Sequence, residues 1–228
     1  MSAVLATWLD AVRAGHAGPD DLAAAVRGDD PRHLVTGLPE RDVVELYELP
    51  AALAGPVSLA LPVPGDPVGL GGPTSFTLAA MEAGQAVVAG AVGLVPEEDA
   101  RTVLWRAHPA DRVPWVDERE TAAELKIVLA DVTRRLVDLD VAAWQPDIPD
   151  LLLNLRHRPP LPLPPSYDGR RLEAAERAVL CLDIVELARA GDGGALSAHE
   201  VNRRRAALDD LDRAARRALV GACAGRAG

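Results

Sequence analysis

The residues best suited to chemistry lie in a segment rich in glycine and proline, residues 64–73, which reads Pro-Gly-Asp-Pro-Val-Gly-Leu-Gly-Gly-Pro. Glycines let a ligand approach backbone N–H groups, and the first turn of the helix expected next favours an anion and offers two hydroxyls. Because α/β folds commonly bind ligands between a strand end and a helix start, we predict a ligand site here. The predicted ligand-binding residues are Gly65, Asp66, Gly69, Gly71, Thr74, Ser75 and Glu82.

The charge around this segment indicates the kind of ligand. Eight acidic residues and no lysine, arginine or histidine lie between Asp42 and Ala100. A free phosphate would therefore find no nearby cation in this part of the sequence, and Asp66 would repel it. The acidic window favours a cationic small ligand, a metal or an arginine-rich partner surface, although no Cys/His cluster has zinc-ligand spacing and we predict no cofactor.

Two other interpretations of the segment stay open. In an enzyme, a hydrolase or transferase site at residues 64–73 would use Asp66 as base or metal ligand, assisted by Glu82 or by arginines of the C-terminal half. Alternatively, the glycines and prolines only set the backbone angles of a connection between strand and helix. We assign no catalytic residue.

A second candidate surface is the consecutive Arg203, Arg204 and Arg205, in a C-terminal stretch that holds seven arginines and four acids. These arginines are a candidate contact for an acidic protein partner. They are more typical of a solvated helix in which Asp209 pairs with Arg213 and Asp212 with Arg216. Nucleic acid is not expected as a partner, because three net positive charges do not offset the repulsion from a chain of net charge −10.

Several motifs with known chemistry are absent from the sequence. There is no G-x-x-x-x-G-K-[ST], G-x-G-x-x-G, H-E-x-x-H or G-x-S-x-G pattern. The two cysteines, Cys181 and Cys223, are far apart and suit a reducing cytosol better than a disulfide framework. We expect Cys181 to be an inert core residue and Cys223, near a helix end, to be the more reactive thiol.

The first 110 residues show alternating helix and strand signals. Helices are predicted for residues 2–14 with Ser2 as N-cap, for 19–26, for 42–54 with an interruption at Pro50, and for 75–83 with Gly84 after the last turn. Strands are predicted for residues 33–36, 57–61, 86–95 and 101–107. These elements indicate an acidic α/β unit over residues 1–112, with about three or four short strands.

After Pro114 the strand signals stop, and residues 113–228 read as a helical bundle. Leucines, valines and alanines from Ala122 to Ala143 alternate spacings of three and four, which predicts a buried seam containing Leu129 and Leu136. A central helix is expected from Leu172 to Ala190, and a last helix after Ser197 as its N-cap. The proline tract before Asp168 reads as a stiff connector.

Composition completes the sequence-based prediction. Hydrophobic residues make up 49% and charged residues 25%, as in globular proteins, and no apolar stretch is long enough to span a bilayer. We predict an α+β protein whose two parts pack as one globule, bacterial and cytoplasmic, with no membrane association and with a homodimer allowed. Its expected role is a non-catalytic ligand-binding or protein-interaction module, with the hydrolase or transferase as the alternative.

Overall fold

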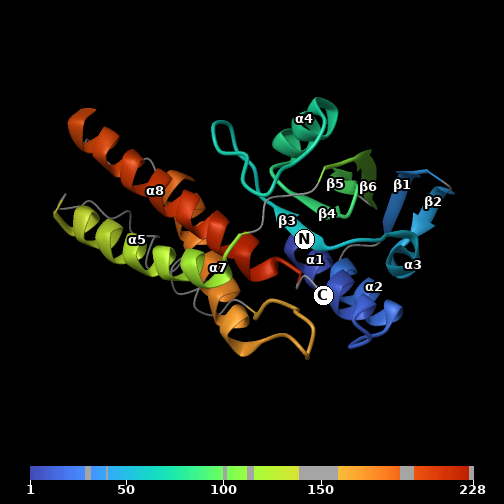
Figure 1. Cartoon of the computed structure of the whole chain (residues 1–228). Helices are drawn as coiled ribbons and strands as arrows, with labels where there is room; N and C mark the ends of the chain where they lie inside the picture. The colour runs from blue at the N-terminus through green and yellow to red at the C-terminus, as the bar shows by residue number, and fades with distance from the viewer. Residues whose placement is uncertain are drawn as a thin grey trace. The chain divides into compact units, whose positions relative to one another are not determined.

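A computed structural model of the chain (Figure 1) describes residues 1–28, 32–39, 41–99, 102–111, 116–138, 159–190 and 198–225. Contacts divide the chain into two units, which are described separately. The α/β unit consists of Met1–Val116, Pro162–Leu172 and Cys223–Gly228, and the helical unit consists of Asp117–Leu161 and Glu173–Ala222. The N-terminal part therefore mixes helices and strands, and the C-terminal part is mostly helical, as the sequence predicts.

One six-stranded sheet forms the centre of the α/β unit, in the order β2-β1-β6-β5-β4-β3. β1 runs parallel to β6, and the other neighbouring strands are antiparallel. The strands are β1 (His33–Leu38), β2 (Arg41–Glu45), β3 (Val57–Ala60), β4 (Ala86–Ala89), β5 (Val92–Asp99) and β6 (Thr102–Pro109). The sheet thus has more than the three or four strands predicted.

Two predicted elements were wrong, and they account for the extra strands. Residues 42–54, predicted as a helix, begin instead as β2, followed by the short helices η1 (Leu46–Glu48) and α3 (Leu49–Ala52). Pairing with β1 buries Val44 and outweighs the local helical pattern. The stretch predicted as a single strand, residues 86–95, is an antiparallel pair that turns at Gly90, whose φ of 59° suits glycine.

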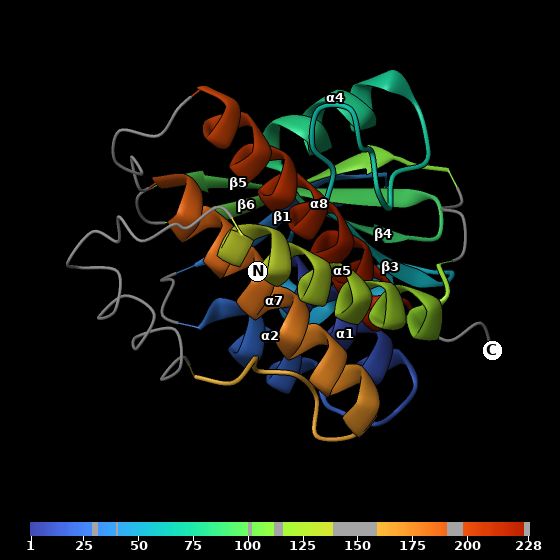
Figure 2. The same ribbon diagram turned by 90° about the vertical axis from the view of Figure 1, so that its left-hand side faces the viewer.

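Helices cover the two faces of the sheet (Figure 2). α4 (Thr74–Ala83) packs on β5 and β6 from one side, and α1 (Ser2–Arg13) packs on β3 and β4 from the other, next to α2 (Pro19–Arg27). Ser2 is the first residue of α1 and not its predicted cap, because Met1 takes the cap position. The Ser2 N–H donates a hydrogen bond to Gln85 Oε1 at 3.1 Å.

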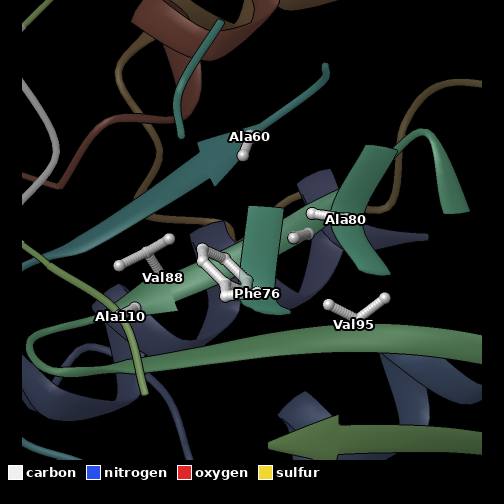
Figure 3. Packing of buried hydrophobic residues seen from close by; sticks show 7 residues of the cluster. Ala60, Phe76, Ala80, Val88, Val95 and Ala110 are labelled. Atoms are coloured by element: carbon white, nitrogen blue, oxygen red, sulfur yellow. The ribbon is translucent and has the colours of Figure 1, made fainter. Parts of the chain in front are cut away.

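Under α4 the packing depends on a glycine. The Phe76 ring is fully buried and points at the sheet among Ala60, Val88 and Val95 (Figure 3). A Cβ on Gly93 would lie 2.3 Å from the Phe76 ring, so the ring rests directly on the backbone of β5. The sheet face therefore accepts its one phenylalanine only because Gly93 has no side chain.

The β3 edge of the sheet is covered by parts of the same chain. The N–H of Gly225 donates to the Val57 carbonyl at 2.7 Å, and the N–H of Leu61 donates to the Val68 carbonyl at 3.1 Å. The Trp8 indole also donates to the carbonyl of Pro162, in the proline tract, at 2.6 Å. The proline tract from Pro162 onward and the chain after the last helix therefore belong to the α/β unit, as the contacts indicate.

The helical unit contains α5 (Glu118–Asp138), most of α7 (Gly169–Ala190) and most of α8 (Ala198–Cys223). Among the described helices, none is both long and apolar enough to cross a membrane. The predicted seam is partly correct: Leu125 and Val132 are buried, whereas Leu129 and Leu136 are only half-buried. The seam positions Leu139 and Ala143, like the predicted cap Ser197, lie outside the described residues.

The buried surface of α7 differs from the apolar pattern of its sequence, which places Leu172, Val179, Leu182 and Val185 on one face and Leu180, Ile184 and Leu187 on the other. Small side chains are buried there, whereas Leu180 is 39% exposed and the other leucines and the isoleucine of the helix are half-buried. The buried apolar residues are Ala174, Ala175, Ala178, Cys181 and Val185, and Arg171 is buried as well. The apolar pattern identified the helix but misassigned its buried face, because alanines allow closer helix packing than leucines do.

The burial of a side chain of α5 predicts how much its truncation lowers the free energy of unfolding. Leu125→Ala should lower the free energy of unfolding by about 2–5 kcal/mol, because truncation of a buried leucine leaves a cavity. Ile127→Ala, on the same helix but 71% exposed, should change it by less than about 0.5 kcal/mol. Urea denaturation of both variants measures this, and equal effects would contradict the assigned face of α5.

A histidine makes the stability of the α/β unit dependent on pH. His108 Nε2 is buried without a hydrogen-bond partner in the described structure, and the ring centroid lies 6.1 Å from that of Phe76. Burial lowers the pKa of His108 below 6.5, and the charge of Arg106 lowers it further, while Glu97 opposes the shift. The unfolded chain therefore binds this proton more tightly than the folded chain.

Accordingly, the free energy of unfolding should fall as the pH decreases below about 6.5 and should be insensitive to His108 above it. His108→Gln should remove part of this slope, whereas His16→Gln, at an exposed position, should keep it. Denaturation measured from pH 5 to 8 tests the expectation; identical slopes in all three proteins would refute the role of His108.

Candidate functional site

The predicted ligand loop folds as two successive turns. Val63 and Asp66 exchange both backbone hydrogen bonds, at 3.1 and 2.9 Å, around Pro64 and Gly65. Gly65 has a φ of 86°, which suits the third position of a type II turn. The second turn is closed by the N–H of Leu70, which donates to the Pro67 carbonyl. The proline and glycine positions thus match turn chemistry.

The glycines of this loop let backbone come close to them, and in the structure the backbone that does so belongs to other parts of the α/β unit. A Cβ on Gly69 would lie 2.5 Å from the Leu59 carbonyl oxygen and 2.7 Å from Ala60 Cα, on β3. A Cβ on Gly72 would lie 2.9 Å from the N–H nitrogen of Asp111, whose own N–H donates to the Gly71 carbonyl. These contacts support the interpretation in which the glycines set the path of a connection.

The other predicted residues are spread along α4. Thr74 and Ser75 are exposed in its first turn, and Glu82 is exposed in its last turn. Eight residues of α-helix separate Thr74 from Glu82, which is about 12 Å along the axis. Asp66 is half-buried in its turn. The ligand-binding role of this loop and its preference for a cation stay predictions.

The arginine cluster of α8 is divided between two environments. Arg203 and Arg205 are exposed, whereas Arg204 is half-buried and donates to the Ala188 carbonyl of α7 at 2.6 Å. One of the three arginines therefore holds two helices together. A protein contact through the other two stays a prediction.

One of the two ion pairs predicted within α8 is confirmed. Asp212 binds Arg216 at 2.9 Å, but Asp209 binds Arg189 of α7 at 2.7 Å instead of Arg213. Asp210 binds Arg135 of α5 at 2.8 Å. Acidic residues of α8 thus reach arginines on both neighbouring helices, which explains much of the charge in this region as helix-to-helix contacts.

The cysteines offer no reactive thiol. Both are 2% exposed. Burial raises the pKa of Cys181, and burial raises the pKa of Cys223 to about 12 against the opposing effects of Arg171 and Tyr167. The expectation that Cys223 is the more reactive thiol was wrong, because the end of α8 is buried. In the described part of the chain, no group of three or more His, Cys, Asp or Glu residues is placed to hold a metal ion.

A hollow of about 370 Å³ lies at one end of the sheet, within the α/β unit. Its wall is formed by the β1–β2 hairpin, by α3 and the residues after it, and by the turn between β4 and β5. The residues that line it are Leu38, Pro39, Arg41, Ala51, Ala52, Ala54, Ala89, Ala91 and Val92. Among the described residues, Arg41 is the one charged side chain in this lining, and it binds Glu48 at 2.7 Å.

Sequence reasoning did not find this hollow. Its lining comes from three separate stretches of chain and consists mainly of alanines. Alanine side chains have no reactive or polar group that would indicate a binding site in a sequence. Arg41 directly precedes the acidic window that begins at Asp42, but its sequence position does not reveal that the chain folds back over it. Only the pairing of β1 with β2 brings Arg41 to the hollow.

Glycine substitutions test the internal role of the predicted loop. Gly69→Ala should lower the free energy of unfolding by more than about 2 kcal/mol, because it adds a clash with β3 to an unfavourable φ of 80°. Gly65→Ala, whose Cβ would meet nothing, should cost only about 1–2 kcal/mol from its φ. Thermal denaturation measures both; a larger cost at Gly65 would show that Gly69 does not pack as described.

Two family descriptions match the chain. "Rv1486c-like protein, N-terminal domain" covers residues 2–120, and "Rv1486c-like protein, C-terminal domain" covers residues 119–220. No solved structure matches the chain.

Two curated relatives come from Mycobacterium tuberculosis: "Uncharacterized protein MT1533" of strain CDC 1551 and "Uncharacterized protein Rv1486c" of strain H37Rv. Each is 38% identical in an alignment of 124 residues, and the match covers 42% of this chain and 43% of the relative, so it spans less than half of either length. The two domain matches together extend over nearly all of the chain, which therefore belongs to the Rv1486c-like protein family.

Proposed function

We propose that the protein is a non-catalytic binding module and that its α/β unit holds a small ligand in the hollow beside Arg41. The observation that supports the proposal is the lining itself: among the described residues, it combines small apolar side chains with a single guanidinium. Small-molecule sites are concave and mostly apolar, with a few polar groups that orient the ligand, and their volumes begin at roughly 300 Å³. A volume of about 370 Å³ suits a small molecule.

The lining also indicates the chemistry of this ligand. A guanidinium pairs well with a carboxylate, and the alanine, leucine and valine side chains suit an apolar body. The Arg41 side chain is 54% exposed and keeps Glu48 as a neighbour, so a ligand carboxylate would share or displace that ion pair. Exposed ion pairs contribute little, so the exchange costs little. The expected ligand is a short amphipathic carboxylate.

Titration calorimetry with octanoate tests the proposal, with octylammonium and octanol as matched probes. Octanoate should bind best, and Arg41→Gln should weaken it by about tenfold, the usual effect of losing one charge-assisted hydrogen bond. Ala52→Phe should block binding by filling the hollow, whereas Ala24→Phe, at an exposed position of α2, should leave it unchanged.

The matched probes separate this proposal from the earlier expectation. Preferential binding of octylammonium, reduced by Asp66→Asn, would favour the cationic ligand predicted for residues 64–73. Octanoate binding that survives both Arg41→Gln and Ala52→Phe would refute the hollow as the site.

A further inference from the structure

The two edges of the sheet differ in how far the described chain covers them. β3 is covered by the hairpin after it and by Gly225, whereas the outer edge of β2 has no neighbouring strand among the residues that the structure describes. An edge strand presents unpaired N–H and C=O groups and can accept another strand. Val43, in the middle of β2, is 55% exposed, while Val44 on the other face is buried. β2 therefore presents an open backbone edge and an exposed apolar side chain together.

The residues of β2 are complementary to themselves. The strand reads Arg-Asp-Val-Val-Glu from Arg41 to Glu45. When two such strands run antiparallel about Val43, each Arg41 lies opposite a Glu45, the two valines at position 43 meet, and Asp42 lies opposite Val44. Shifting the register by one residue in either direction loses both opposite-charge pairs, and one of these shifts places Asp42 opposite Glu45. Charge thus favours this register over the two neighbouring ones.

The side chains involved share one face of the strand. Successive residues of a strand point to opposite faces, so Arg41, Val43 and Glu45 lie on the same side, away from the buried Val44. Directly opposed side chains on one face are the contacts that stabilise antiparallel pairs. Pairing in this register would place the exposed Val43 against its symmetry mate, between two ion pairs.

Ion pairs within the chain do not prevent this arrangement. Arg41 binds Glu48 at 2.7 Å and Glu45 binds Arg32 at 3.2 Å, with Arg32 61% exposed. A guanidinium has five N–H donors and a carboxylate accepts several hydrogen bonds, so each side chain can bind a second partner.

From these observations we propose that a second copy of this chain binds at β2. The two β2 strands pair antiparallel about a twofold axis at Val43, which joins the two six-stranded sheets into one continuous sheet. Such an interface is isologous, since the same residues contribute from both copies. This assembly goes beyond the ligand site and does not depend on it.

A charge swap tests both the interface and its register. The wild-type protein should be dimeric in sedimentation velocity, with a monomer fraction that grows on dilution. Arg41→Glu and Glu45→Arg should each raise the dissociation constant of the dimer by about tenfold or more, since each replaces two attractive pairs with two repulsive ones. The double variant Arg41→Glu/Glu45→Arg should restore dimerisation, because the opposite charges face each other again.

The rescue separates pairing between copies from damage within one copy. The double variant still lacks the native contacts with Glu48 and Arg32, so a fault in the hairpin of a single chain would persist in it. Arg106→Glu is the matched control, because Arg106 is an exposed arginine of the same sheet that pairs with Glu97, away from β2. This variant should stay dimeric.

Circular dichroism and thermal melting confirm that each variant folds. A wild-type protein that stays monomeric at every soluble concentration would overturn the proposal. So would a dimer unaffected by either single reversal, or a folded double variant that stays monomeric.

Discussion

Backbone hydrogen bonding at the edges of an open sheet is the constraint on which the α/β unit depends. Each outer strand carries N–H and C=O groups that need partners, and the chain supplies them at β3 by turning back after Leu61 and by placing Gly225 beside Val57. At β2, no strand pairs with the outer edge among the described residues, and Arg41 and Glu45 flank the exposed Val43. The two edges therefore differ in how many of their backbone groups the described chain pairs.

The glycines of the connection after β3 follow from the same constraint. To cover the edge, the chain must reverse twice within a few residues and then lie against β3 and against the residues after β6. Gly69 and Gly72 allow these contacts because a Cβ at either position would clash with backbone. A glycine-rich loop between strand and helix is thus typical of ligand sites but is equally required where a chain packs on itself, and sequence alone does not separate the two.

Folding places charged residues in different surroundings in the two units. In the helical unit, Asp209 and Asp210 reach arginines on α7 and α5, so charges remote in sequence form contacts between helices. In the α/β unit, the long acidic window has a cation at its border, Arg41, and folding brings that cation to an apolar hollow. The net charge of the sequence window therefore does not indicate which charged group lies beside this hollow.

The sequence by itself determined the class of fold, the change from strands to helices near Pro114, the helix that carries Phe76, and the turn-forming character of residues 64–73. These features depend on local periodicity and on the conformational preferences of glycine and proline, which act over a few residues. Tertiary structure alone decided that residues 41–45 form a strand, that small side chains make the buried face of α7, that Cys223 is inaccessible, and that Arg41 meets the alanines of a hollow. Each of these features depends on contacts with residues distant in the chain. The energy of those contacts outweighs local conformational preference, and the local sequence does not indicate them.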